Sequence, residues 1–135
     1  MARGPVSRDP RFEDVLGPLA AAIAREVTAR VEASVADVVI GLRETQGREY
    51  AHTTVMTVMG RLFEKGVLAR EQRGRQYVYR PVASESAVVE RLSALAVDRL
   101  VDRYGAAALR HFAVRLADLD PITRRRLASL ADEQE

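Results

Sequence analysis

One stretch, residues 50–81, constrains the fold more than any other part of the chain; it reads YAHTTVMTVMGRLFEKGVLAREQRGRQYVYRP. Apolar residues recur in its first half at the spacing of a helix with one buried face. They are Val55, Val58, Met59, Leu62 and Phe63. The other face is mostly short or charged, and we expect Thr53 or Thr54 to cap the helix start by accepting a hydrogen bond from a free N–H. Gly66 marks its end.

The second half of this stretch predicts a β-hairpin. Residues 67–71 and 76–80 are rich in β-branched, aromatic and long side chains, and Gly74 between them suits a tight turn. Pro81 lacks an N–H, so we expect strand pairing to stop there. A helix with a small polar face, followed by a hairpin tipped with Arg73 and Arg75, is the outline of a winged helix-turn-helix. In such domains the helix enters a major groove and the hairpin, or wing, approaches phosphates.

The residues before this stretch complete a small domain. A helix is predicted from residue 16 to about residue 30, with Pro18 in its first turn. Residues 31–33 could pair with the wing as a third strand. Ser34 and Asp37 have the spacing of a capping box and predict a second helix, to about residue 45. We therefore assign residues 16–82 to a winged helix-turn-helix DNA-binding domain. Residues 1–15 are expected to form a flexible N-terminal arm.

Residues 83–135 predict three amphipathic helices, separated near Gly105 and Asp120. Because short isolated helices are marginal, their apolar faces must be covered. A two-fold contact with a second copy buries the same patch twice, and packing back on the first domain is the alternative. The overall class is mainly α with a small β-hairpin wing and a C-terminal helical dimerisation domain. The residues assigned to dimerisation are Val89, Leu92, Leu95, Leu100, Leu109, Phe112 and Leu116.

The distribution of charge is more informative than its total. The formal net charge is only +2. Residues 61–80, however, hold six Lys and Arg against two Asp and Glu, which favours a nucleic-acid contact over a merely solvated surface. All but one of the 21 basic residues are arginines, which suits bidentate phosphate and guanine contacts, although genomic base composition gives the same bias.

Several classes of function are disfavoured. The chain has no cysteine, which excludes disulfides and cysteine-ligated metals. His52 and His111 lie far apart and in no metal motif, so we expect no metal and no cofactor. Neither a nucleophile elbow nor a Gly-rich phosphate loop is present, so we expect no enzyme. No apolar run approaches the roughly 20 residues that cross a bilayer, and the start lacks a signal-peptide pattern, so a cytoplasmic location is expected.

The segment TTVMTVMGRLFEKGVLAREQRGRQYVYRP closely resembles the penicillinase-repressor family of bacterial transcription regulators (BlaI/MecI/CopY type). LGPL at residues 16–19 and the run at residues 34–39 resemble the family's first two helices, so the likeness spans roughly residues 16–116. It implies a homodimeric repressor on inverted repeats with a TACA/TGTA-type core. By position it assigns groove and backbone contacts to Thr53, Thr54, Thr57 and Arg61 of the helix and to Arg73, Arg75 and Tyr77 of the wing.

The chain also departs from the family. Its first helix lacks the tryptophan that is common there, and without cysteines it lacks the ligands of the copper-responsive branch. His111-Phe112 is the nearest match to the Asn-Phe bond that is cut in the antibiotic-responsive branch, and we do not assign a cleavage site to it. The inducing signal and any inactivating protease stay open. A protein-interaction module on the same fold is the alternative function, disfavoured because the exposed helix face offers Met56 as its only large apolar anchor.

Overall fold

The computed structural model describes residues 9–132. The chain forms two compact units, one of Pro10–Leu92 and one that holds the residues from 93 onward. Within the described part, no helix combines the length and the apolar character that a membrane crossing requires. The elements are mostly helical, with one small antiparallel sheet, as the sequence predicted.

Three α-helices build the first unit, after a short 3-10 helix η1 (Phe12–Asp14): α1 (Pro18–Arg30), α2 (Val35–Gln46) and α3 (His52–Glu64). The capping box that starts α2 is confirmed, because Asp37 N donates to Ser34 Oγ at 3.2 Å and Ser34 N donates to Asp37 Oδ2 at 3.0 Å. The threonine cap of α3 is wrong. The helix begins at His52 and its N-cap is Ala51, without a side-chain hydrogen bond, so both threonines lie inside the first turn.

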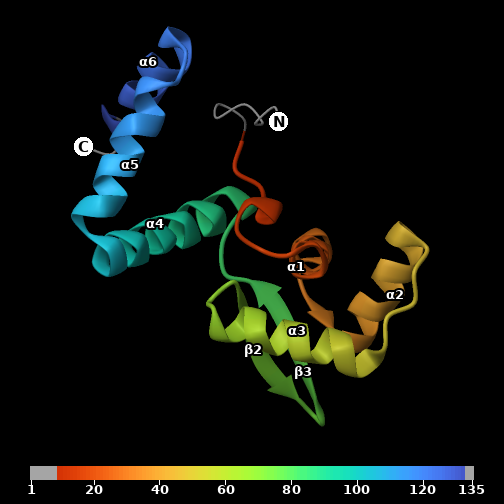
Figure 1. Ribbon diagram of the computed structural model, residues 1–135. Coiled ribbons are helices and arrows are strands. Elements are labelled where there is room, and N and C mark those ends of the chain that lie inside the picture. The colour runs from red at the N-terminus through yellow and green to blue at the C-terminus, as the bar shows by residue number, and fades with distance from the viewer. Residues whose placement is uncertain (1–8, 133–135) are drawn as a thin grey trace. The chain divides into compact units, whose positions relative to one another are not determined.

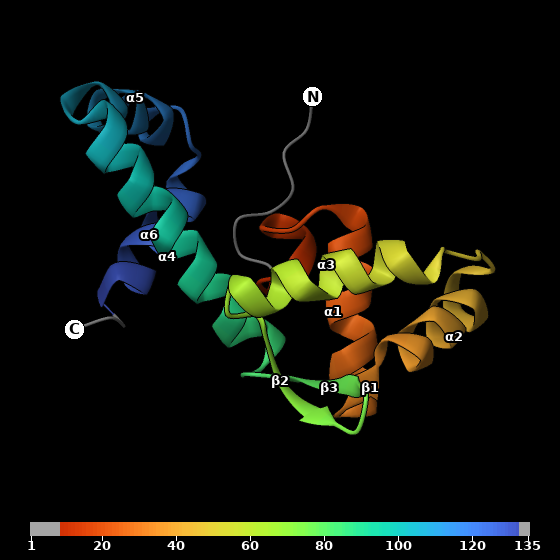
Figure 2. The same cartoon turned by 90° about the horizontal axis from the view of Figure 1, so that it is seen from below.

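The sheet has the order β1-β3-β2, with β1 (Ala33–Ser34), β2 (Leu68–Arg73) and β3 (Gln76–Pro81). The hairpin pairs Arg73 with Gln76, so its turn consists of Gly74 and Arg75, and Gly74 takes the positive φ of 67° that favours glycine. Pro81 closes the ladder opposite Leu68. In both views α3 lies beside this hairpin (Figures 1 and 2).

The predicted third strand is present but shorter than expected. Ala33 pairs with Tyr79, whereas Val31 and Glu32 stay outside the sheet. Val31 has φ 71° and ψ −42°, and among the described residues it is the one non-glycine residue with a positive φ. Its side chain is 71% exposed. The link between α1 and β1 is therefore a strained turn rather than a strand.

The core lies between the three helices and the sheet, and it extends beyond residues 16–82. Its members include Ile23, Val27, Val38, Leu42, Val55, Met59, Leu62, Leu68, Tyr79, Phe12, Val88 and Val89.

The residues just before α1 are held on this core. Phe12 is only 1% exposed, and its N–H donates to Glu85 Oε2 at 2.8 Å. Arg25 donates to Glu13 and to Glu85, and its hydrogen bond lowers the pKa of the Glu13 carboxyl. The predicted flexible arm is thus wrong for residues 10–15, while residues 1–8 lie outside the described part.

The remaining helices are α4 (Glu85–Tyr104), α5 (Ala106–Ala117) and α6 (Pro121–Asp132). Gly105, with φ 55°, separates the first two as expected. Asp120 caps the third by accepting from Thr123 N at 2.8 Å. The first turns of α4 bury Val88 and Val89 in the core of the first unit, whereas α5 buries no side chain. The second unit therefore has little core of its own among its described residues.

Candidate nucleic-acid interface

Helix α3 presents a polar face on the side opposite its buried residues. Val55, Met59 and Leu62 are buried, which fixes the rotation of the helix on the core. Thr53, Thr54 and Thr57 are exposed together on the other side. The Thr57 hydroxyl donates to the Thr53 carbonyl at 2.9 Å. Its hydrogen is therefore already used, and the methyl group and the oxygen lone pairs are left for an external contact.

Arg61 continues this face one turn beyond Thr57. It is exposed, and its side chain has no hydrogen bond or ion pair to any other residue in the described part of the chain. Without a carboxylate partner, the N–H donors of its guanidinium are left for an external anion. Its position at the end of the threonine face suits a contact with a phosphate beside the groove.

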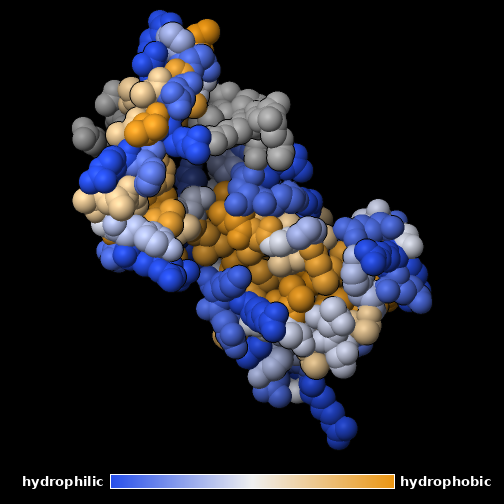
Figure 3. Space-filling model, viewed as in Figure 1, coloured by the Kyte–Doolittle hydropathy of each residue, from blue (hydrophilic) through white to orange (hydrophobic). Residues whose placement is uncertain are grey.

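The two arginines at the wing tip, which the sequence treated alike, differ in their surroundings. Arg73 donates to Glu32 Oε1 at 3.0 Å and Oε2 at 3.1 Å, and it also contacts Glu71. The hydrogen bonds from Arg73 lower the pKa of the Glu32 carboxyl. Arg75, in contrast, is exposed and pairs with no carboxylate of residues 9–132. Figure 3 shows a hydrophilic surface over the hairpin tip. Of the two, Arg75 is the cation that no carboxylate of these residues neutralises.

Tyr77, the third wing residue that the sequence assigned to DNA, lies in an aromatic cluster. Its ring lies edge-on to Tyr79 at 6.3 Å, so the two rings share one ribbon face, as expected. The guanidinium carbon of Arg70 lies 4.1 Å from the Tyr77 ring centre and 4.0 Å from that of Phe63. Phe63 was expected in the core and is instead 37% exposed against Arg70. Tyr79 is buried, whereas Tyr77 remains 42% exposed.

Sequence reasoning missed Arg70. The signal that could have found it is the register of the hairpin. A two-residue turn at Gly74 and Arg75 places Arg70 directly opposite Tyr79, on the face that also carries Tyr77. Its Nη1 donates to Tyr79 Oη at 3.4 Å.

The residues assigned to dimerisation divide into two groups. Val89 is buried in the core of the first unit, and Leu92 is partly buried against that core, so both are used at least in part within this unit. The others are exposed by 41–57%: Leu95, Leu100, Leu109, Phe112 and Leu116.

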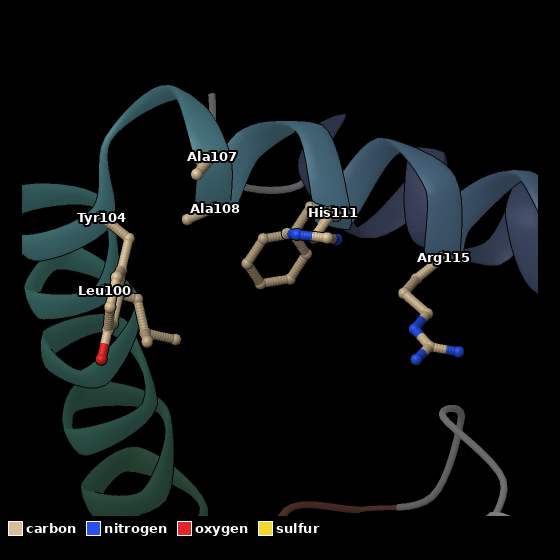
Figure 4. Close-up of a pocket in the computed structure, with 7 residues that line it drawn as sticks. Leu100, Tyr104, Ala107, Ala108, His111 and Arg115 are labelled. Atoms are coloured by element: carbon tan, nitrogen blue, oxygen red, sulfur yellow. The ribbon is translucent and has the colours of Figure 1, made fainter.

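In the second unit, α4 and α5 border a pocket of about 520 Å³ that is open to solvent. Leu100 and Tyr104 line it on one side, and His111 and Arg115 line it on the other (Figure 4).

Nothing in the described residues resembles a metal site, since they contain no group of three or more His, Cys, Asp or Glu side chains placed to hold an ion. Among the same residues, no buried side-chain nitrogen or oxygen lacks a hydrogen-bond partner. The polar groups of interest are therefore those on the surface of α3 and the wing.

Comparison with solved structures gives several similar proteins. The structure of a CopR repressor is 32% identical, covers 46% of this chain and 87% of that one, and has a TM-score of 0.38. The DNA-binding domain of the repressor BlaI is 26% identical over 58% of this chain and 89% of that one, with a TM-score of 0.42. TrmBL2, an archaeal chromatin protein, is 20% identical over 82% of this chain and 40% of that one, and its TM-score of 0.54 shows a shared fold.

Among curated proteins the comparison finds no match. The family model of the penicillinase repressor, in contrast, matches residues 16–133, which is most of the chain. The matched range includes the winged helix and the three C-terminal helices. With its helical fold, its small antiparallel sheet and its winged helix, the chain belongs to the penicillinase repressor family of DNA-binding transcription regulators.

Proposed function

We propose that this transcriptional repressor acts as a homodimer on an inverted-repeat operator with a TACA/TGTA-type core. The observation that carries the proposal is the face of α3, where three exposed threonines are followed by the unpaired Arg61. An α-helix fits a major groove, and threonine methyl groups pack well against thymine methyl groups there. Base choice would come from this face, while Arg61 and Arg75 would supply salt-sensitive contacts with phosphates.

The second part of the proposal concerns the helices that follow the winged helix. Leu109, Phe112 and Leu116 are all exposed on α5, a helix that buries no side chain. Apolar surface gathered in this way marks an interaction site more often than scattered single residues do. A second copy is the occupant that we propose, because a two-fold contact covers both faces at once and matches the symmetry of an inverted repeat.

The DNA part is tested by fluorescence anisotropy on a labelled duplex that carries the inverted repeat, with a scrambled duplex as control, over a salt series. We expect a clear preference for the repeat, with two chains bound per duplex. Equal and salt-sensitive binding to both duplexes would exclude the TACA/TGTA core. No binding even at low salt would refute the DNA function and favour the protein-interaction alternative.

The dimer is tested by sedimentation equilibrium of the Leu109→Glu, Phe112→Glu double variant. Two buried charges without partners would disfavour association, so we expect a monomer at concentrations where the unmodified protein is a dimer. The matched control is Arg110→Glu, which changes the charge of the same helix but removes no apolar surface. A dimer that persists in the double variant would remove this face from the interface.

A further inference from the structure

Arg70 lies on β2, where α3 and the wing meet. Its guanidinium is placed between two rings, that of Phe63 in the last turn of α3 and that of Tyr77 on β3. The two ring centres lie 4.0 Å and 4.1 Å from the guanidinium carbon. Within the described part of the chain no carboxylate forms a salt bridge with Arg70, so its contacts are aromatic and, through Tyr79, hydroxyl.

The chemistry of this arrangement requires arginine. A guanidinium is planar and weakly hydrated, so it can stack on two rings at once, whereas a lysine ammonium is compact and holds its water. The arrangement also adds a second contact between two elements whose apolar residues, Leu62 of α3 and Leu68 of β2, already share the core. Gly66, with φ 74°, follows the end of α3, and β2 begins only two residues later.

We propose that Arg70 is a positioning residue that fixes the wing against α3, so that the threonine face and Arg75 reach one duplex together. The proposal rests on the proposed DNA binding and deepens it. If the wing is held before binding, less ordering is needed when the complex forms, and affinity rises without a new contact. The competing explanation is that Arg70 itself contacts a phosphate, which its partial exposure allows.

The two explanations differ in what a lysine does. In the full-length protein, we compare Arg70→Lys and Arg70→Met on the repeat duplex across a salt series. If Arg70 positions the wing, both variants weaken binding by about tenfold, lysine is no better than methionine, and the lysine variant keeps the salt slope. If Arg70 contacts a phosphate, lysine restores nearly full affinity and methionine lowers the slope by about one per chain. That second result would overturn the proposal.

A matched control removes a charge from the same ribbon without removing an aromatic contact. Arg80 is exposed on β3, and it stacks on no ring in the described part of the chain. Arg80→Met should therefore leave the wing in place and change binding only through its charge. An equal, salt-independent loss in Arg80→Met would show that the effect at Arg70 is not specific to the stacked arginine.

The positioning role is also decided without DNA. In the free protein the Arg70 side-chain protons should resonate upfield, because two rings shield them. In Arg70→Met the heteronuclear NOE of Gly74 should fall, while the values for α3 stay unchanged. An equally rigid wing in the variant would overturn the proposal. If the unmodified protein binds neither duplex, the proposed function and the DNA role of Arg70 fail together, but this measurement still decides whether Arg70 holds the wing.

Discussion

The contrast between Arg73 and Arg75 gives the sharpest prediction about DNA binding. Arg75 pairs with no carboxylate of residues 9–132. If it contacts a phosphate as we propose, replacing it with glutamine removes one such contact from each chain. Each contact adds about 0.9 to the magnitude of the slope of log K against log salt, so a dimer would lose about 1.8. Between about 50 mM and 200 mM salt, this difference changes the affinity ratio of wild type to variant by about twelvefold.

The control variant removes a cation together with one of its two carboxylate partners, Glu32, and leaves Glu71 in place. Arg73 forms two hydrogen bonds with Glu32, so the Arg73→Gln, Glu32→Gln double variant leaves the charge of the wing balanced. We expect its salt slope to stay within about 0.3 of the wild-type slope. Anisotropy titrations at four or more salt concentrations measure both variants. If the double variant flattens the slope as much as Arg75→Gln does, Arg73 must leave Glu32 to bind a phosphate, and the reasoning from the free structure is refuted.

Three further predictions concern the first unit. Phe12→Ala should lower the free energy of unfolding by about 3 kcal/mol and the melting temperature by about 12–24 °C, because it deletes a ring that is only 1% exposed. As a control, Arg11→Ala replaces an exposed side chain and should change the free energy of unfolding by less than about 0.5 kcal/mol. The hydrogen bond from the Ser34 N–H lowers the pKa of the Asp37 carboxyl. The stability that this carboxylate contributes is therefore present above its ordinary pKa of about 3.9, and it is lost as the pH falls through the lower pKa of the folded state. Asp37→Asn should therefore melt below wild type at pH 7, and the gap should close as the pH falls below about 3.9; a constant gap would contradict this. At Thr57, valine keeps the methyl group and serine keeps the hydroxyl. Thr57→Val should therefore retain the preference for the repeat over the scrambled duplex, while Thr57→Ser should lose about 1 kcal/mol of this preference. A larger loss in Thr57→Val than in Thr57→Ser would assign the contact to the hydroxyl.

The parts of the fold that depend on neighbours in sequence could be predicted. The buried stripe of α3, the capping box at Ser34 and the breaks at Gly66 and Gly105 each follow from residues within one or two turns of one another. The hairpin was predictable for the same reason, since its turn and both strands lie within residues 68–81.

The parts that failed depend on partners far along the chain. Phe12 stands among charged residues and has no helical or strand pattern around it, so nothing local indicates that it is buried. The Glu85 carboxylate, which accepts a hydrogen bond from the Phe12 N–H, lies 73 residues away in sequence. The burial of Val89 in the first unit and the pairing of Arg73 with Glu32, 41 residues distant, have the same origin. The difference between the paired Arg73 and the unpaired Arg75, on which our DNA prediction rests, therefore required the structure.

Val31 shows that the chain has not been optimised for stability. A β-branched residue with φ 71° and ψ −42° lies outside the favoured left-handed region, and such strain costs of order 1–3 kcal/mol. The 71% exposed side chain returns little packing energy. Glycine at this position would relieve the strain and lose about 1 kcal/mol to backbone entropy, so Val31→Gly should leave the melting temperature unchanged or raise it. For protein engineers, Val31 is a position where thermal tolerance can be sought without changing a residue of α3 or of the wing.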